Sequence, residues 1–140
     1  MQANTEILNC SVRIASFIDG KKTIFSGMGA LHLSNGEVVA LQYTQGDSLV
    51  SLSLKSGERF VRMTRKGDYF LDIPFSEKQT TIGKIGLSAG DAGEVTVYTE
   101  RAEYNYDSSA ETFNLSLSYA LRFPKEEQKV ILRLTTKRER

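Results

Sequence analysis

The stretch ETFNLSLSYALRF, residues 111–123, alternates between large apolar and small or polar side chains along nearly its whole length. The large side chains fall on odd positions: Phe113, Leu115, Leu117, Tyr119, Leu121 and Phe123. The even positions carry the smaller or polar ones: Thr112, Asn114, Ser116, Ser118, Ala120 and Arg122. Because successive residues of a strand point to opposite faces of a sheet, this period of two predicts a long β-strand with one face in a core.

The same alternation recurs between turn signals that are spaced almost evenly along the chain. Gly, Asp, Asn and Ser cluster at residues 19–21, 34–36, 46–47, 56–57, 66–68, 90–93 and 107–109, and Pro124 marks a further turn. The runs between these turns are roughly 6 to 12 residues long, which favours strands over the helices of a bundle. We expect strands near residues 8–18, 23–33, 38–45, 49–55, 59–65, 69–73, 80–87, 94–105, 112–123 and 130–136.

The short connections decide how these strands pair. A parallel neighbour needs a crossover of about a dozen residues, so consecutive strands here must run antiparallel. An open sheet of this many strands would leave two unpaired edges, whereas closure removes them. The sequence therefore predicts an all-β, single antiparallel up-and-down β-barrel of about 8–10 strands. Two packed sheets remain an alternative, although sandwiches usually need longer crossovers.

Composition places the chain in one globular class. Its 140 residues are 40% hydrophobic and 25% charged, which fits a single domain over residues 1–140. Net charge is +1, so there is no overall attraction to nucleic acid or anionic lipid. No apolar run reaches the roughly 18 to 20 residues of a membrane helix, so we expect no membrane association. Cys10 is the only cysteine and is expected in the core, which agrees with a cytoplasmic location.

Glycine interrupts the second expected strand on its apolar side. Gly27 and Gly29 share a face with Phe25 and Leu31. Inward positions without side chains let a strand bend at a barrel corner, and they also permit close approach of another group. We interpret these glycines as bend positions, with a pocket wall as the alternative.

Several of these features stand in an order that resembles a known family. They are the Asp19-Gly20 hairpin, the basic strand ending in Arg65-Lys66-Gly67, Phe75, the Thr80-Thr81-Ile82-Gly83 strand, Thr99, and Leu117-Ser118-Tyr119-Ala120-Leu121. In these residues the chain resembles the YwiB-like family of small bacterial proteins, over roughly residues 12–136. The resemblance implies a calycin-type, lipocalin-like barrel without an established function. The family's Tyr-x-Thr-Pro-x-Gly-like segment reads Ile85-Gly86-Leu87-Ser88-Ala89-Gly90 here, so no role is carried over from it.

Enzyme motifs are the next question, because they would decide the function. His32 is the only histidine, and no cysteine lies close to it in sequence, which leaves no zinc-ligand or Cys-His spacing. The sequence contains no G-x-S-x-G elbow and no phosphate-binding loop. We therefore predict a protein that is not an enzyme, with no metal, cofactor or catalytic residue.

A basic stretch covers residues 58–66 and offers one candidate site. Arg59 and Arg65 share one face of the expected strand, whereas Phe60 and Arg62 share the other. We expect Phe60 in the core, which would point Arg62 inward toward a carboxylate or a ligand. A snorkelling arginine at the barrel rim is the alternative. Single-stranded nucleic acid could also bind this basic strand from Arg59 to Lys66, with aromatic residues nearby, although the low net charge disfavours it.

Tyrosines offer the second candidate site. Tyr98, Tyr104 and Tyr106 share sequence parity, and Tyr119 lies in the middle of the 111–123 strand. Tyrosine combines apolar bulk with a hydroxyl that needs a partner when buried, so several in one lumen would make it amphipathic. They could equally hydrogen-bond to one another. The predicted function is a non-catalytic binding module for a small amphipathic ligand or a protein partner, with ligand-binding residues Phe60, Arg62, Tyr98, Tyr104 and Tyr119.

The other face of the 111–123 strand suggests how a partner could bind. Ser116, Ser118 and Ala120 are small and uncharged. A flat exterior of this kind permits close approach by a second subunit, so a homodimer through this sheet is a further hypothesis.

Overall fold

The computed structural model describes residues 4–55 and 57–139, and these form ten strands. The strands are β1 (Thr5–Ile18), β2 (Lys21–Ser34), β3 (Glu37–Gln45), β4 (Ser48–Leu54), β5 (Phe60–Lys66), β6 (Phe70–Ser76), β7 (Gln79–Gly86), β8 (Gly93–Asp107), β9 (Thr112–Arg122) and β10 (Glu127–Arg138). Each coincides with one of the ten expected runs, so the all-β prediction is confirmed. One helical turn, Ala89–Asp91, interrupts the described chain, and no described helix is long and apolar enough to cross a membrane.

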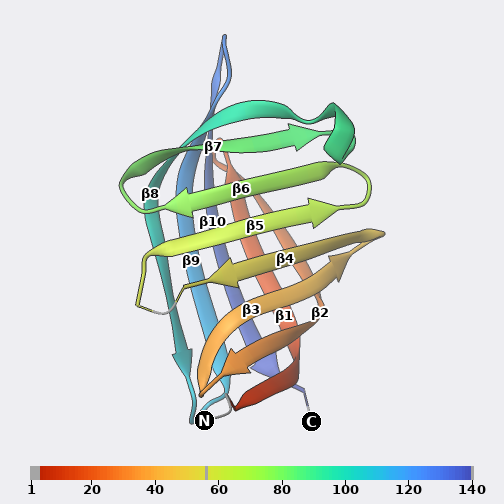
Figure 1. Cartoon of the computed structure of the whole chain (residues 1–140), viewed down its shortest axis with the longest axis vertical. Helices are drawn as coiled ribbons and strands as arrows, with labels where there is room; N and C mark the ends of the chain where they lie inside the picture. The colour runs from red at the N-terminus through yellow and green to blue at the C-terminus, as the bar shows by residue number, and fades with distance from the viewer. Residues whose placement is uncertain (1–3, 56, 140) are drawn as a thin grey trace.

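The strands close into one barrel in which sequence neighbours are spatial neighbours. Every consecutive pair is antiparallel, and β1 pairs with β10 from Cys10↔Arg138 to Ile18↔Val130. The predicted up-and-down barrel is therefore confirmed, and the two-sheet alternative is not adopted. In Figure 1 strands β4 to β7 run across the long strands β8, β9, β10 and β1.

Two hairpins show why the strands turn where they do. Asp19 and Gly20 have φ values of 50° and 84°, and Asn35 and Gly36 have 53° and 81°. Two successive residues with positive φ make the mirror-image turn whose twist matches the flanking strands. Asn and Asp tolerate this region and Gly occupies it freely, so these dipeptides set the β1–β2 and β2–β3 registers.

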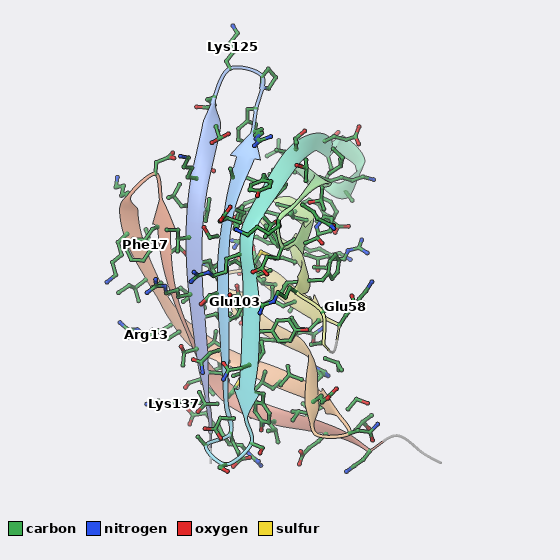
Figure 2. The ribbon with its side chains drawn as sticks, turned by 90° about the vertical axis from the view of Figure 1, so that its left-hand side faces the viewer. Arg13, Phe17, Glu58, Glu103, Lys125 and Lys137 are labelled. Atoms are coloured by element: carbon green, nitrogen blue, oxygen red, sulfur yellow. The ribbon has the colours of Figure 1, made fainter. Side chains whose placement is uncertain are left out.

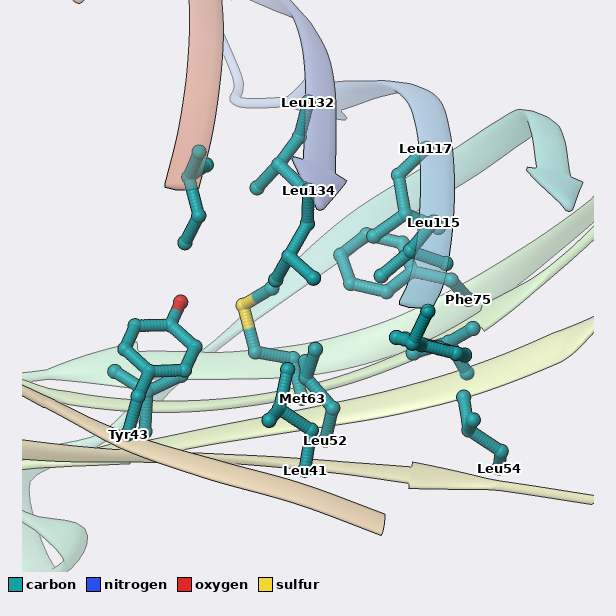
Figure 3. Packing of buried hydrophobic residues seen from close by; sticks show 14 of the residues in the cluster. Leu41, Tyr43, Leu52, Leu54, Met63, Phe75, Leu115, Leu117, Leu132 and Leu134 are labelled. Atoms are coloured by element: carbon teal, nitrogen blue, oxygen red, sulfur yellow. The ribbon is translucent and has the colours of Figure 1, made fainter. Parts of the chain in front are cut away.

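The inward row of each strand forms a continuous core. Leu115 and Leu117 are each 1% exposed, and Phe113 and Phe75 are fully buried beside them. Figure 3 shows Leu115 and Leu117 of β9 packing beside Phe75 of β6. The alternation predicted for residues 111–123 is thus confirmed, except that Phe123 lies beyond the end of β9 and is 38% exposed. Cys10 is fully buried in the same core, as expected, and its burial raises the pKa of the thiol.

A β-bulge in β8 breaks the alternation that sequence parity implied. Thr99 pairs with Tyr119 but the next pair is Arg101↔Ser118, so Glu100 is an extra residue. An extra residue exchanges the two faces of everything beyond it. Tyr98 consequently faces outward while Tyr104 faces inward, and the prediction that they share a face is wrong.

The glycines of β2 lie where that strand changes partners. Gly27 and Gly29 face inward as expected, and pairing with β3 begins only at Gly29, whereas β1 pairs along the whole of β2. A Cβ on Gly29 would lie 2.6 Å from the carbonyl oxygen of Gln42 and 2.9 Å from a methyl group of Val12. Gly29 therefore permits a close approach between β2 and β3 at the point where the two strands separate.

Candidate ligand cavity

A cavity of about 470 Å³ occupies one end of the barrel interior. It lies at the end closed by the β1–β2, β3–β4, β5–β6 and β9–β10 turns, and its volume falls in the ~300–1,000 Å³ range of small-ligand pockets. Its walls are mainly apolar: Ile14, Phe25, Val50, Met63, Leu71, Ile85, Leu121, Val130 and Leu132. Without a ligand, a cavity of this volume would hold roughly fifteen water molecules, most of them next to apolar side chains. We call it the barrel cavity.

The barrel cavity is lined on one side by the strands that separate at Gly29. Thr23 and Phe25 come from the part of β2 that pairs only with β1, and Tyr43 and Gln45 come from the facing end of β3. The rings of Phe25 and Tyr43 contact across this gap, with centroids 5.7 Å apart. Side-chain packing thus replaces the missing backbone ladder there.

Arg65 brings a positive charge into the barrel cavity. It follows Val61 and Met63 on the inward row of β5, and its side chain is only 13% exposed. The Nη1 donates to Oε1 of Gln45 at 2.9 Å, and Nη2 donates to Oδ1 of Asp68 at 3.1 Å. The guanidinium also lies over the ring of Tyr69, 4.4 Å from its centroid. Arg65 is the only charged side chain among the described residues that line this cavity.

Asp68 holds Arg65 from the β5–β6 turn, on the solvent side. Its side chain is 61% exposed, and its Oδ1 accepts hydrogen bonds from Ser48 Oγ and from the backbone N–H of Tyr69. The hydrogen bond from Ser48, followed by those from Arg65, holds the pKa of the Asp68 carboxyl below its usual range. The turn comes close to β4, because a Cβ on Gly67 would lie 2.4 Å from Oγ of Ser48. Asp68 is therefore an ionised counter-ion placed at the rim.

Two tyrosine hydroxyls complete the polar part of the barrel cavity. Tyr43 comes from β3, and Figure 3 shows its hydroxyl directed into the interior, on the side of Met63. Tyr119 comes from β9 and packs against Phe75 with ring centroids 4.4 Å apart. Neither hydroxyl has a hydrogen-bond partner among the described residues. Burial raises the pKa of Tyr43 to about 12 and that of Tyr119 further, so both phenols are hydrogen-bond donors at neutral pH.

Of the predicted tyrosines, Tyr119 alone lines the barrel cavity. Tyr104 faces inward, but toward the opposite end of the barrel. There its hydroxyl donates to the carbonyl of Lys55, and its ring lies 6.2 Å from that of Phe113. Tyr98 lies on the outer face, where the guanidinium of Arg122 is 5.7 Å from its ring. The bulge at Glu100 is the physical reason that the predicted tyrosine cluster is not formed.

The predicted orientation of the basic strand is wrong. Phe60 is half-buried on the outer row of β5, with the ammonium of Lys55 4.8 Å from its ring, and Arg62 shares that outer row. Arg62 binds Asp72 through two hydrogen bonds of 2.9 and 2.7 Å. This pairing holds the pKa of Asp72 below its usual range. An aromatic side chain such as Phe60 can lie on the outer face of a strand when a neighbouring lysine covers its ring. Its apolar character was therefore not enough to place it in the core.

Sequence reasoning missed Arg65 and Tyr43, although both follow from parity. Val61 and Met63 are the apolar members of their strand, and Arg65 continues the same row. Likewise Leu41 and Tyr43 share the buried row of β3. The face of β5 that carries two apolar side chains, Val61 and Met63, is the better choice for the core than the face that carries only Phe60. That choice would have placed Arg65 inside the barrel.

A second hollow of about 510 Å³ lies on the flank of the barrel, between the β4–β5 connection and β8. Figure 2 shows Glu103 on this flank, with Glu58 across from it. The charged groups there satisfy one another, because Arg59 contacts Glu77 at 3.3 Å and Glu103 at 3.0 Å. No group of three or more His, Cys, Asp or Glu side chains that could hold a metal ion occurs in the described ranges. The barrel cavity is therefore the better candidate site.

The comparison with solved structures supports the barrel independently. The crystal structure of the ywiB protein from Bacillus subtilis superposes with a TM-score of 0.76 over 96% of this chain and 94% of that one, at 18% sequence identity. The chain has the fold of that protein. No family model matches the sequence, and no match is found among curated proteins. At this identity the likeness concerns the fold, where it confirms the resemblance expected from the sequence.

Proposed function

We propose that this protein is a binding module that holds a small amphipathic molecule in the barrel cavity. The observation that carries the proposal is the pair of hydroxyls of Tyr43 and Tyr119, which point into an apolar cavity without a protein partner. Among the described residues Thr99 Oγ1 is the one fully buried polar side-chain atom without a partner, so the two tyrosine hydroxyls are reached by solvent, and a ligand that accepts hydrogen bonds from them would displace water. The apolar walls would bury the rest of the ligand.

The proposed role is binding without chemistry, in the cytoplasm. Its support is the character of the titratable groups in the barrel cavity. Arg65 is a permanent cation, and the phenols of Tyr43 and Tyr119 keep their protons at neutral pH, so these groups bind and orient rather than transfer protons. The cytoplasmic location is supported by the single cysteine, which is buried and reduced.

Native mass spectrometry and dye binding test this proposal. Freshly purified protein should retain a small molecule, and an environment-sensitive apolar dye should bind the emptied protein with one site per chain. Ser16→Leu fills the barrel cavity from β1, so we expect it to abolish dye binding. Ser26→Leu places the same side chain on the outer row of β2 and should bind like the wild type. Equal dye binding by both variants would show that the dye does not occupy this cavity.

The nucleic-acid alternative has less support at the strand where it was expected. Arg59 and Arg62 are bound by carboxylates, and Arg65 points into the barrel. Phosphate contacts would have to break these ion pairs first. A salt-dependent gel shift with single-stranded RNA, lost in Arg62→Gln, would nevertheless favour this alternative over ligand binding.

A further inference from the structure

We propose that the polar end of the ligand is a single carboxylate, which binds Arg65 together with the hydroxyls of Tyr43 and Tyr119. This inference rests on the proposed function and names the class of ligand: an unbranched or ring-bearing apolar molecule with one acidic end. Three observations carry it, namely the free donors on Arg65, the convergence of the two phenols, and the position of Asp68.

Arg65 retains donor capacity toward the barrel cavity. A guanidinium carries five N–H donors in a planar fork. The described side chains take four contacts from it: three to Asp68 and one to Gln45. At least one N–H therefore remains for another acceptor. A carboxylate matches the planar fork of arginine better than other small anions do, because its two oxygens lie in the same plane.

The two phenols lie close to this donor. Tyr43 pairs with Val50 and Val50 pairs with Arg65, so Tyr43 and Arg65 lie two strands apart on the same inward row. The positive charge of Arg65 lowers the pKa of Tyr43, against the larger raising effect of burial. Tyr119 lines the same cavity from β9. At least one N–H and two O–H donors thus belong to residues that line the same cavity. A neutral alcohol could use these hydroxyls, but only an anion would gain from Arg65 as well.

The charge of the site limits the ligand to one negative charge. Arg65 is the sole cation among the described lining residues, and all the other lining residues are uncharged. A dianion would leave one charge uncompensated in a medium of low dielectric constant, which costs several kcal/mol. A cationic end would meet Arg65 itself and be repelled.

Asp68 serves as the counter-ion of Arg65 while the barrel cavity is empty. Its contacts to the guanidinium are 3.1 to 3.4 Å long, and it sits on an exposed turn from which it can swing into water. An incoming carboxylate would replace it, so that Arg65 is never left unpaired. Asp68 and the ligand therefore compete, and removal of the Asp68 charge should strengthen ligand binding.

The first experiment compares three probes of equal chain length on the full-length wild-type protein by isothermal titration calorimetry. They are decanoate, decanol and decyltrimethylammonium. We expect decanoate to bind about 10- to 100-fold more tightly than decanol. This ratio corresponds to the free energy that hydrogen bonds to a charged group contribute to binding. Decyltrimethylammonium should bind most weakly. Equal affinities, or a preference for the cation, would overturn the carboxylate assignment without any variant being needed.

The second experiment uses variants with opposite expected signs. Arg65→Gln should weaken decanoate binding about 10- to 100-fold and leave decanol binding unchanged. Asp68→Asn should strengthen decanoate binding about two- to fivefold, since an exposed charge interaction is modest. Arg62→Gln, on the outer row of the same strand, is the matched control and should change neither. A purely structural role for Arg65 and Asp68 would weaken all probes alike, and that result would refute the inference.

The outcomes also separate this inference from the function on which it rests. If neither decanoate nor decanol binds, and the dye does not bind either, the proposed cavity function fails together with the inference. If decanol and the dye bind but decanoate has no advantage, the cavity function stands and only the carboxylate assignment fails.

Discussion

Tyr43 shows how a single residue couples the barrel interior to pH. Its phenol lies in an apolar wall, where burial raises its pKa to about 12, against about 10 in an unfolded chain. A proton held more tightly in the folded state favours folding until the unfolded phenol ionises. This contribution is complete below pH 10 and disappears as pH rises from 10 to about 12.

The expected loss is about 3 kcal/mol, because the pKa of Tyr43 rises from 10.0 to about 12. Urea unfolding at a series of pH values from 7 to 12 should show the free energy of unfolding falling above pH 10. Tyr43→Phe should make that fall less steep, because the group that ionises is gone. Tyr98→Phe removes a phenol from the outer face and should keep the wild-type fall. A wild-type curve that stays flat up to pH 12 would contradict the burial of Tyr43.

Gly29 supports a second prediction at the residue scale. Gly29→Ala would place a Cβ 2.6 Å from the backbone carbonyl oxygen of Gln42, which cannot move without disturbing β3. Overpacking of this kind costs about 1–3 kcal/mol, so chemical denaturation should show a loss of that size. Gly93→Ala is the matched control, because nothing lies within 4 Å of its Cβ position, and it should leave stability nearly unchanged. Equal stability of the two variants would mean that β2 and β3 are further apart.

At the scale of the element, β8 contains one residue more than the segment of β9 with which it pairs, and that residue is Glu100. Before the bulge its inward row includes Val97 and Thr99, and after it Ala102 and Tyr104. Glu100 makes this change of phase possible while its own side chain stays in solvent, paired with Lys78. The core therefore does not use the carboxylate of Glu100, and the extra residue adds a local bend to the strand.

Deletion of Glu100 tests that statement. Without the extra residue, Arg101 would follow Thr99 directly, the pairing with β9 would become regular, and Ala102 and Tyr104 would keep their inward positions. Only the local bend of the bulge is lost, so we expect the deletion variant to fold cooperatively by circular dichroism and thermal melting, with a loss of about 0.5–3 kcal/mol. A deletion variant that does not fold would show that the barrel needs the bulge itself. Glu100→Ala keeps the residue count and should lose less than about 1 kcal/mol, the worth of an exposed ion pair.

At the scale of the whole molecule, the barrel depends on a contact between its first and last strands. The β1–β10 ladder joins residues more than one hundred positions apart and supplies Val130, Leu132 and Leu134 to the core. Each of these side chains contributes about 1.5–3 kcal/mol by burial, which together approaches the stability of an entire domain. We therefore expect that the protein does not fold stably unless β1 pairs with β10.

A chain truncated after Phe123 should therefore lack a cooperative unfolding transition, because β1 and β9 would both become exposed edges. Differential scanning calorimetry checks this, with binding of a dye for exposed apolar surface as the second readout. Removal of residues 139 and 140 alone is the control, and it should lower stability only slightly. A cooperative transition in the long truncation would show that nine strands suffice.

The homodimer hypothesis is a prediction for the whole molecule, and it concerns the outer face of β9. Ser118 and Ala120 lie in a shallow hollow of about 350 Å³ beside Ile131, which is 42% exposed. We expect light scattering after gel filtration to give twice the chain mass. Ser118→Arg should convert the dimer to a monomer, while Ser53→Arg, on the outer row of β4, should leave it intact. A monomer at all concentrations would end the hypothesis.

The strand pattern could be predicted from the sequence because it is a local property. Alternation at residues 111–123 and the turns at Asp19-Gly20 and Asn35-Gly36 depend on backbone sterics and on which side chains avoid water. Ten strands with short antiparallel connections then leave closure as the way to remove both edges. The barrel, its strand order and the burial of Leu115, Leu117 and Cys10 followed from these facts alone.

The site was decided only by the tertiary structure, because it depends on relations between distant strands. The bulge at Glu100 has no signal in local parity, since it arises where β8 must match the register of β9. Arg65 meets Tyr43 and Tyr119 because three strands far apart in sequence face one cavity. Periodicity tells which side chains share a face of one strand, whereas only closure of the barrel tells which faces meet.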